Sequence, residues 1–285
     1  MSAPETTGVS SFHALRFGRA AARYEAQAGV QARMAEALLT LWGERAAPAG
    51  IVEFGCGTGL LTRRLRARFP DARLTATDAA PEMLDVARAA LHASETAATT
   101  PISLSASPVM FRELDARGDR SSPELLQEPA PDLLAANAVV QWFPDLAAHF
   151  RFAARLAAPQ SFYLVSGFGA GNFPELNALL AEPPFSYQRF PGHDPHDVET
   201  AAARAGWTTG GLLAWDEVEV LLSPRDVLQR LQDLGAVRDP REGGRMTRAN
   251  LAYLLAEYER RFAAVQGEVR GVRLTWKPWA ALLVR

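Results

Sequence analysis

A glycine-rich turn is the feature of this sequence with the clearest chemistry. It reads Glu53-Phe-Gly55-Cys-Gly57-Thr-Gly59 and stands where a strand pattern gives way to a helix pattern. Because glycine has no Cβ, the backbone of such a turn can approach a flat ligand closely. Asp78 ends the next strand pattern, at a position where a carboxylate accepts hydrogen bonds from both ribose hydroxyls of a nucleoside. Together, the turn and Asp78 predict a nucleoside cofactor site.

The spacing of the glycines indicates which kind of nucleoside fits. The dinucleotide fingerprint places its third glycine one position after Gly59, where this chain has Leu60. The carboxylate of Glu53 would repel a pyrophosphate, whereas it suits a cofactor that carries sulfonium and ammonium groups. We therefore expect a cationic nucleoside cofactor rather than a dinucleotide.

The E-x-G-x-G-x-G pattern resembles motif I of the class I S-adenosylmethionine methyltransferases. The resemblance implies S-adenosyl-L-methionine as cofactor, with S-adenosyl-L-homocysteine as the product. It implies that Asp78 binds the ribose, that Met83 packs on the adenine and that Asp115 reaches the adenine amino group. Asn137 would lie beside the sulfonium. Met83 is equally consistent with an ordinary helix core residue, and Asp115 with a turn former.

A second resemblance extends over most of the chain. Phe17 to Ala21, Tyr24 and Gln31 look like the leader of the malonyl-acyl-carrier-protein O-methyltransferases of biotin synthesis. Similar runs follow in the family's order: NAVVQW, SGFGAGNFPEL, VLQRLQDLGA, GRMTRANL and RLTW. The expected cofactor-binding residues are Gln31, Glu53, Gly55, Gly57, Gly59, Asp78, Met83, Asp115 and Asn137. Long loops near 92–107 and 116–130, and the turn from Ala158 to Ser161, depart from the family and leave the acceptor open.

The family's reaction moves a methyl group to the free carboxylate of a malonyl thioester on acyl carrier protein, or on coenzyme A. A carboxylate is already ionised at neutral pH, so the transfer needs no general base, and positioning carries the catalysis. The sequence shows no Ser-His-Asp arrangement, and its five histidines have no metal-ligand spacing. We therefore assign no metal.

The substrate side of the site is expected to contain an aromatic residue and an arginine. The leader of the family places Tyr24 at the active-site rim, although it could be an aromatic residue of a lid core. An arginine would hold the nonreacting carboxylate oxygen, because its planar fork matches that acceptor. Arg19, Arg151 and Arg189 are the candidates, each also consistent with a surface charge, and Arg151 is the working assignment. Arginines between Arg225 and Arg248 form either a docking patch for an acidic carrier protein or solvated helix faces.

The elements that position these residues alternate between strand and helix patterns. A helix over 31–42 precedes a strand from Ile51, and helix, strand and helix follow up to about residue 91. Further strands are expected at 133–140 and 162–168, with a helix over 150–156 between them. The alternation predicts an α/β, Rossmann-like class I methyltransferase fold, with a mostly parallel sheet and flanking helices.

The alternation is interrupted after Gly169. A segment rich in proline and aromatic residues runs over 173–195, and strand-like runs follow at 211–222. Helices are expected over 224–234 and 247–262, with one final strand over about 272–284. We divide the chain into a tail (1–10) and a single methyltransferase domain (11–285), with lid elements at about 11–30 and 173–222.

Composition narrows the functional class. The chain has 285 residues, 48% of them hydrophobic, and a net charge of −2 from 30 basic and 32 acidic side chains. This balance does not favour nucleic acid or an anionic membrane as a partner, and no apolar stretch is long enough to span a bilayer. A single cysteine, Cys56, fits a reducing compartment. We expect a monomeric cytoplasmic enzyme. The alternatives are methylation of another small-molecule carboxylate or hydroxyl, and a non-catalytic cofactor-binding assembly factor.

Overall fold

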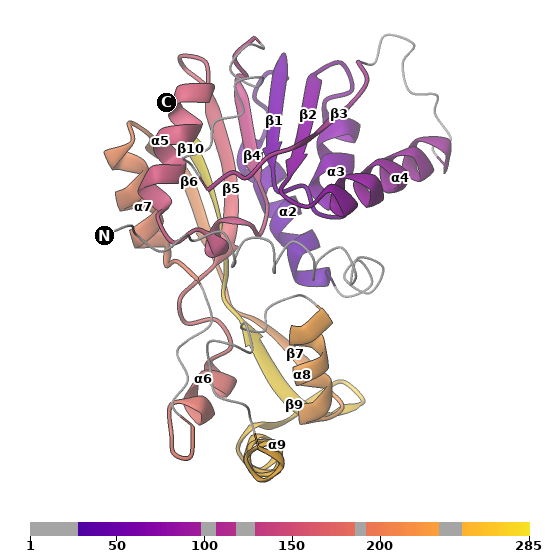
Figure 1. The fold of residues 1–285 in the computed structure, drawn as a ribbon, viewed down its shortest axis with the longest axis vertical. Coiled ribbons are helices and arrows are strands. Elements are labelled where there is room, and N and C mark those ends of the chain that lie inside the picture. The colour runs from indigo at the N-terminus through magenta and orange to yellow at the C-terminus, as the bar shows by residue number, and fades with distance from the viewer. Residues whose placement is uncertain (1–27, 98–106, 118–128, 186–191, 234–246) are drawn as a thin grey trace, which may run out of the picture.

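The strands of the chain form two sheets of unequal size. The computed structural model describes residues 28–97, 107–117, 129–185, 192–233 and 247–285. A seven-stranded sheet has the order β3-β2-β1-β4-β5-β10-β6, and a three-stranded sheet has the order β7-β9-β8. Figure 1 shows the large sheet with its helices, here called the main unit, and a small unit built on β7, β8 and β9 beyond one end of it.

The main sheet is mostly parallel, as expected. Its parallel core consists of β1 (Gly50–Phe54), β2 (Arg73–Asp78), β3 (Met110–Glu113), β4 (Leu133–Ala136) and β5 (Phe162–Phe168). The last strand, β10 (Pro278–Val284), lies antiparallel between β5 and β6 (Thr208–Ala214). Every residue of β1 and β4 is buried, which is typical of parallel strands covered on both faces.

Helices cover both faces of the main sheet. On one face, α2 (Gly29–Trp42) and α3 (Leu60–Arg68) pack on side chains such as Ile51 and Leu133, and α4 (Pro81–Ala97) packs against α3. On the other face, α5 (Leu146–Leu156) and α7 (Pro195–Arg204) enclose a core that includes Val52 and Leu134. A short 3-10 helix, η2 (Val140–Trp142), follows β4. Neighbouring residues of one strand thus face opposite cores, as the period of two requires.

The small unit has its own core. Strands β7 (Glu217–Leu221), β9 (Val269–Trp276) and β8 (Ala263–Gln266) pack with α6 (Pro174–Leu180), α8 (Pro224–Asp233) and α9 (Arg248–Phe262). Val30 and Met34 of α2 are buried in this same core, so α2 belongs to both units. Helix α2 also forms an ion pair with β7, between Arg33 and Glu217. No helix in the described ranges is long and apolar enough to cross a membrane.

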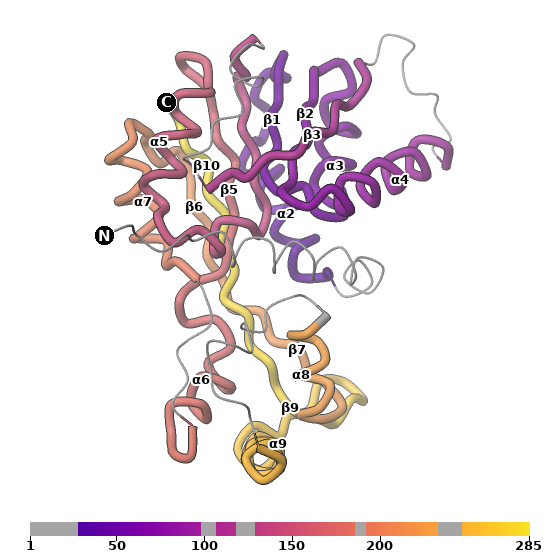
Figure 2. Tube along the Cα trace, in the orientation of Figure 1, coloured from indigo at the N-terminus to yellow at the C-terminus, as the bar shows by residue number. Residues whose placement is uncertain are grey.

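Several predicted boundaries were wrong. The final strand expected over 272–284 is two strands, because the chain leaves the small sheet at Lys277 and enters the main sheet at Pro278 (Figure 2). Residues 92–97, expected in a loop, continue α4, and the strand expected over 133–140 ends at Ala136. The segment 173–222 divides between the units: α6 and β7 belong to the small unit, whereas α7 and β6 belong to the main unit.

Candidate cofactor and active site

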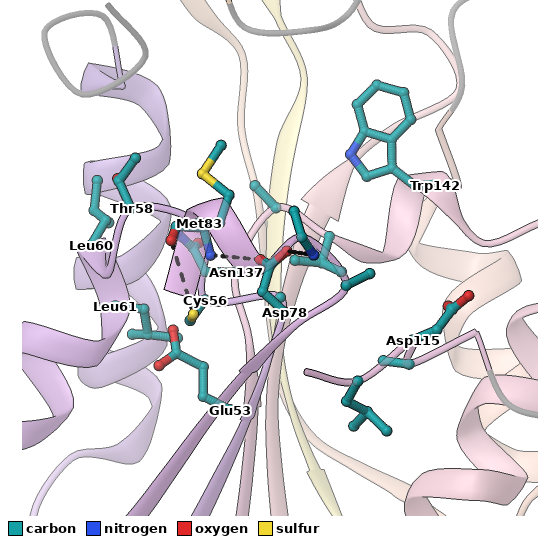
Figure 3. A pocket seen from close by; sticks show the side chains of 18 of the residues that line it. Glu53, Cys56, Thr58, Leu60, Leu61, Asp78, Met83, Asp115, Asn137 and Trp142 are labelled. Atoms are coloured by element: carbon teal, nitrogen blue, oxygen red, sulfur yellow. Dashed lines mark hydrogen bonds between the residues drawn. The ribbon is translucent and has the colours of Figure 1, made fainter. Parts of the chain in front are cut away.

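One cavity lies at the carboxyl ends of β1, β2 and β4, where open parallel sheets bind their ligands. Figure 3 shows Glu53, Asp78, Met83 and Asn137 around it, with Asp115 and Trp142 across from them. The structure brings eight of the nine expected cofactor residues to its wall: Gln31, Glu53, Gly55, Gly57, Asp78, Met83, Asp115 and Asn137. These residues are separated by up to about a hundred positions in sequence, so the fold itself assembles the site.

The three glycines of the turn have three different roles. A Cβ on Gly57 would have no atom within 4 Å, so this position borders open space, whereas a Cβ on Gly55 would lie 2.5 Å from a methyl group of Val139. Gly59 does not line the cavity. It precedes α3, and a Cβ there would lie 3.1 Å from the Cα of Ala87 in α4. The missing Cβ at Gly59 allows α3 and α4 to pack closely, and its expected contact with the cofactor stays a prediction.

Asp78 connects the turn to the second strand. Its carboxylate accepts hydrogen bonds from the backbone N–H groups of Gly57 and Ala80, each over 2.9 Å. A carboxylate has about four acceptor positions, so the backbone fixes its orientation and leaves capacity for two hydroxyl donors. Burial raises the pKa of Asp78, and these backbone hydrogen bonds oppose the rise.

Glu53 is a buried acid at the floor of the site. The Thr62 hydroxyl donates to Glu53 Oε2 over 2.6 Å. Burial raises the pKa of Glu53 to about 8; the Thr62 hydrogen bond opposes this rise, and the charge of Asp78 adds to it. Burial alone therefore favours the protonated form of Glu53 near neutral pH, and a cation placed beside it would favour the ionised form.

Two buried polar atoms at the cavity have no partner in the described structure. They are Gln31 Oε1, in the first turn of α2, and Thr58 Oγ1, in the glycine turn. Buried polar groups are nearly always hydrogen-bonded, so unpartnered ones beside a cavity indicate a site that can bind a polar ligand. An amide oxygen accepts from an ammonium group, and with Glu53 and Asp78 it makes this wall rich in acceptors. The residues present fit a nucleoside that carries positive charge.

Asn137 links three elements at the end of β4. Its Nδ2 donates to the backbone oxygen of Gln31 over 3.1 Å, and its Oδ1 accepts from the Ser166 hydroxyl over 2.7 Å. The next residue, Ala138, has a positive φ of 55°, and its N–H is bonded to Ser166. Asn137 therefore holds the start of α2 against β4 and β5 as well as lining the cavity.

Beside the expected residue Asp115, the cavity contains an arginine that the sequence interpretation missed, Arg117. Asp115 and Arg117 both line the cavity and form an ion pair. The backbone oxygen of Ala116 accepts a hydrogen bond from Nδ1 of His149 over 2.6 Å, and the Tyr163 hydroxyl lies 2.7 Å from Nε2. Burial lowers the pKa of His149 to about 4, so the ring is neutral: Nδ1 donates and Nε2 accepts from Tyr163. Arg117 could have been suggested by the sequence, because it lies two residues after Asp115, just beyond the end of a strand.

The structure does not bring the assigned arginine to this cavity. Arg151 is exposed on α5, because its neighbours Phe150 and Phe152 occupy the buried face of that helix. It is absent from the residues that line the cavity, so its assignment to the substrate carboxylate is not supported. Tyr24, Arg19 and Arg189 lie outside the described residues.

Comparison with known proteins identifies the family. A model described as a methyltransferase domain matches residues 52–163. The malonyl-[acyl-carrier protein] O-methyltransferase of Geobacter sulfurreducens is 30% identical over 260 residues, which cover 88% of this chain and 91% of that protein. The chain belongs to this methyltransferase family. The expectation of an S-adenosylmethionine-dependent methyltransferase is thereby confirmed.

Two further similarities concern a second relative of this methyltransferase and a solved structure. The biotin biosynthesis bifunctional protein BioCD of Bordetella avium is 31% identical over 260 residues, covering 88% of this chain and 50% of that protein. The YcgJ protein of Bacillus subtilis superposes with a TM-score of 0.57 at 13% identity, covering 88% of this methyltransferase and 97% of that chain. The second similarity shows a shared fold. The mostly parallel seven-stranded sheet, together with the methyltransferase domain match over 52–163, confirms the Rossmann-like class I prediction.

Proposed function

We propose that the protein transfers the methyl group of S-adenosyl-L-methionine to the free carboxylate of a malonyl group on acyl carrier protein, early in biotin synthesis. The observation that carries this proposal is the relationship to the Geobacter enzyme across 88% of the chain. The cavity supports it, because the expected cofactor residues converge there from distant parts of the sequence.

Each wall of the cavity has a separate task in this proposal. Asp78, oriented by two backbone N–H groups, accepts the ribose hydroxyls. Gln31 Oε1 and Glu53 bind the ammonium end, where the buried acid ionises in response to the positive charge. Met83 packs on the adenine ring, and the Asp115 carboxylate accepts a hydrogen bond from the adenine amino group. When bound, S-adenosyl-L-methionine supplies an electrophilic methyl group on its sulfonium.

The acceptor oxygen needs alignment rather than activation. A malonyl carboxylate is ionised at neutral pH, so the site requires no base for it. Trp142 and Phe143 give the cavity an apolar side that excludes water from the transfer. The hydrogen bond from Asn137 to the backbone of Gln31 holds the end of β4 against the start of α2, beside the cavity. Tyr24 at the rim remains the proposed contact to the substrate.

We also propose that the small unit and the leader close over the bound cofactor. Gln31 lines the cavity while Val30 and Met34, on the same turns of α2, lie in the core of the small unit. The Arg33–Glu217 ion pair joins α2 to β7. Ordering of Gln31 by the cofactor would therefore be transmitted to the small unit through α2.

The carrier protein is the proposed partner on the outer surface. Carrier proteins are acidic, so exposed arginines of the small unit are candidates for docking. Arg225, at the start of α8, and Arg248, at the start of α9, are both exposed. Their contribution would appear as a higher KM for carrier-bound malonyl after Arg225→Glu, with unchanged KM for malonyl-coenzyme A.

Incubation with radiolabelled cofactor and malonyl carrier protein tests the proposed reaction. Label should appear on the carrier, and alkaline hydrolysis should release it as methanol, because the product is a methyl ester. Acetyl carrier protein is the matched control and should stay unlabelled. Absence of label from malonyl carrier, alongside labelling of another carboxylic acid or a phenol, would contradict the proposed acceptor.

A further inference from the structure

The pair formed by Asp115 and Arg117 has a geometry that the proposed cofactor contacts do not yet use. Arg117 Nε donates to Asp115 Oδ1 over 2.8 Å and to Oδ2 over 3.1 Å, and Nη2 donates to Oδ2 as well. The backbone N–H of Arg117 also donates to Oδ1, over 3.2 Å. Both carboxylate oxygens are thus engaged by one planar fork, which fixes the plane of the carboxylate.

The backbone that carries this pair is itself held in place. Leu114 N–H donates to the backbone oxygen of Asp78 over 2.9 Å, so the loop starts against the strand of the ribose ligand. The backbone oxygen of Ala116 is bonded to the buried His149 ring. The loop is anchored on both sides of Asp115, and the fork of Arg117 restricts rotation of the Asp115 side chain.

A fixed acceptor can distinguish purines. Asp115 and Arg117 are each about one-third exposed, so loss of the Arg117 fork would let the Asp115 carboxylate turn toward water. Arg117 donates three hydrogens to this carboxylate, which has about four acceptor positions and lines the cavity, so a 6-amino group in the cavity can donate to it as well. A 6-oxo group at the same place would set an acceptor against an acceptor, and a site built for a donor strongly rejects such an analogue.

We propose that Arg117 is a positioning residue that locks Asp115 as acceptor for the adenine amino group, and so sets the selectivity of the site for adenine over 6-oxopurine nucleosides. The proposal rests on the adenine-binding role proposed for Asp115. It assigns Arg117 to cofactor selectivity rather than to the substrate carboxylate.

Calorimetric titration of the full chain with S-adenosyl-L-homocysteine and with S-inosyl-L-homocysteine tests this role. Wild-type protein should prefer the adenosyl compound, and Arg117→Ala should reduce the ratio of the two dissociation constants by about tenfold or more. Arg117→Lys, which keeps the charge but not the fork, should give an intermediate ratio. In an Asp115→Asn background, Arg117→Ala should change the ratio no further.

Arg88→Ala is the matched control. It removes a similar Arg–Asp pair on the surface of α4, between Arg88 and Asp85, which does not line the cavity. The control should keep the wild-type ratio. If Arg117→Ala weakened both nucleosides by the same factor, Arg117 would be only structural and the proposal would be overturned. A raised KM for malonyl carrier with an unchanged ratio would also overturn it, in favour of a substrate contact.

The binding assay separates this proposal from the proposed function, because it contains no acyl substrate. Malonyl carrier left unmethylated by a protein with the expected selectivity would contradict the proposed acceptor and support the role of Arg117. A wild-type protein that binds both nucleosides equally would overturn the role of Arg117 whatever the acceptor is.

Discussion

The backbone N–H of Gly57 donates a hydrogen bond to Asp78 Oδ2 over 2.9 Å, so the glycine turn and the proposed ribose ligand form one structural unit. The turn follows β1 and the carboxylate ends β2, and these strands are adjacent and parallel. An Asp78→Ala variant would therefore lose the ribose acceptor and also leave two backbone N–H groups without a partner. Substitutions in the turn are cleaner tests of the cofactor site.

Gly57→Ala should mainly weaken cofactor binding, whereas Gly59→Ala should mainly lower the free energy of unfolding. Both positions have positive φ, so each substitution costs about 1 to 2 kcal/mol of unfolding free energy. The new methyl group at Gly57 enters open cavity and should weaken cofactor binding by at least about tenfold, through overlap with the ligand. At Gly59 it meets α4 and should cost about 1 to 3 kcal/mol more in stability. Urea unfolding and calorimetry on both variants check this, and similar losses in both assays would count against the separate roles.

Glu53 should make the stability of the empty protein depend on pH. Its pKa is about 8 in the folded chain, against 4.5 as the ordinary value. Between these values the folded state holds a proton that the unfolded state has released. Titration of Glu53 therefore leaves the free energy of unfolding unchanged below pH 4.5. As pH rises from 4.5 toward 8, it lowers the free energy of unfolding by up to about 1.4 kcal/mol per pH unit.

Glu53→Gln is the variant that isolates this effect. It should flatten the decline, so that without ligand it is more stable than wild type at pH 8 to 9, while cofactor binding is lost. Urea unfolding at a series of pH values measures the difference. An identical pH dependence in wild type and variant would show that Glu53 does not titrate in this range.

Tyr163→Phe should weaken cofactor binding although Tyr163 does not line the cavity, because its hydroxyl bonds to His149. The variant removes the hydroxyl that donates to His149 Nε2 and leaves a buried ring nitrogen without a partner, at a cost of about 1 to 3 kcal/mol in unfolding free energy. His149 holds Ala116, so the affinity for S-adenosyl-L-homocysteine should also fall, by a few-fold. Thermal unfolding and calorimetry measure the two effects. Unchanged affinity in a destabilised variant would show that the network supports only the core.

Closure of the small unit should be visible by hydrogen exchange. Adding S-adenosyl-L-homocysteine should slow exchange in the first turns of α2 and in β7 and β9, because α2 contributes to both the cavity and the small-unit core. Arg33→Ala breaks the ion pair to Glu217 and should reduce the protection of β7 while sparing the turn around Gly57. Equal exchange of the small unit with and without ligand would argue against closure.

The sequence predicted the parts of this site that depend on local pattern. The turn from Glu53 to Gly59 and the strand ending at Asp78 could be recognised because the chain must change from strand to helix at fixed positions. Which glycine borders the cavity could not be predicted, because the difference between Gly57 and Gly59 is set by α4, far along the chain.

Other features depended on contacts that no local pattern encodes. The segment 272–284 was expected to be one strand, yet Lys277 separates strands of two sheets. Arg151 was assigned by residue type alone, and its exposure follows from which face of α5 packs on the sheet. Arg117 was missed because its role depends on where Asp115 and His149 hold the loop in three dimensions.

We propose that the methyl acceptor is the free carboxylate of a malonyl thioester on carrier protein. An equimolar mixture of malonyl, succinyl and acetyl carrier proteins can be incubated with S-adenosyl-L-methionine and this enzyme and followed by intact-protein mass spectrometry. Malonyl carrier should gain one methyl group first, succinyl carrier should react slowly because its carboxylate lies one methylene further out, and acetyl carrier should never react. Methylation of the acetyl carrier, or a malonyl carrier left unchanged, would show that the malonyl carboxylate is not the acceptor.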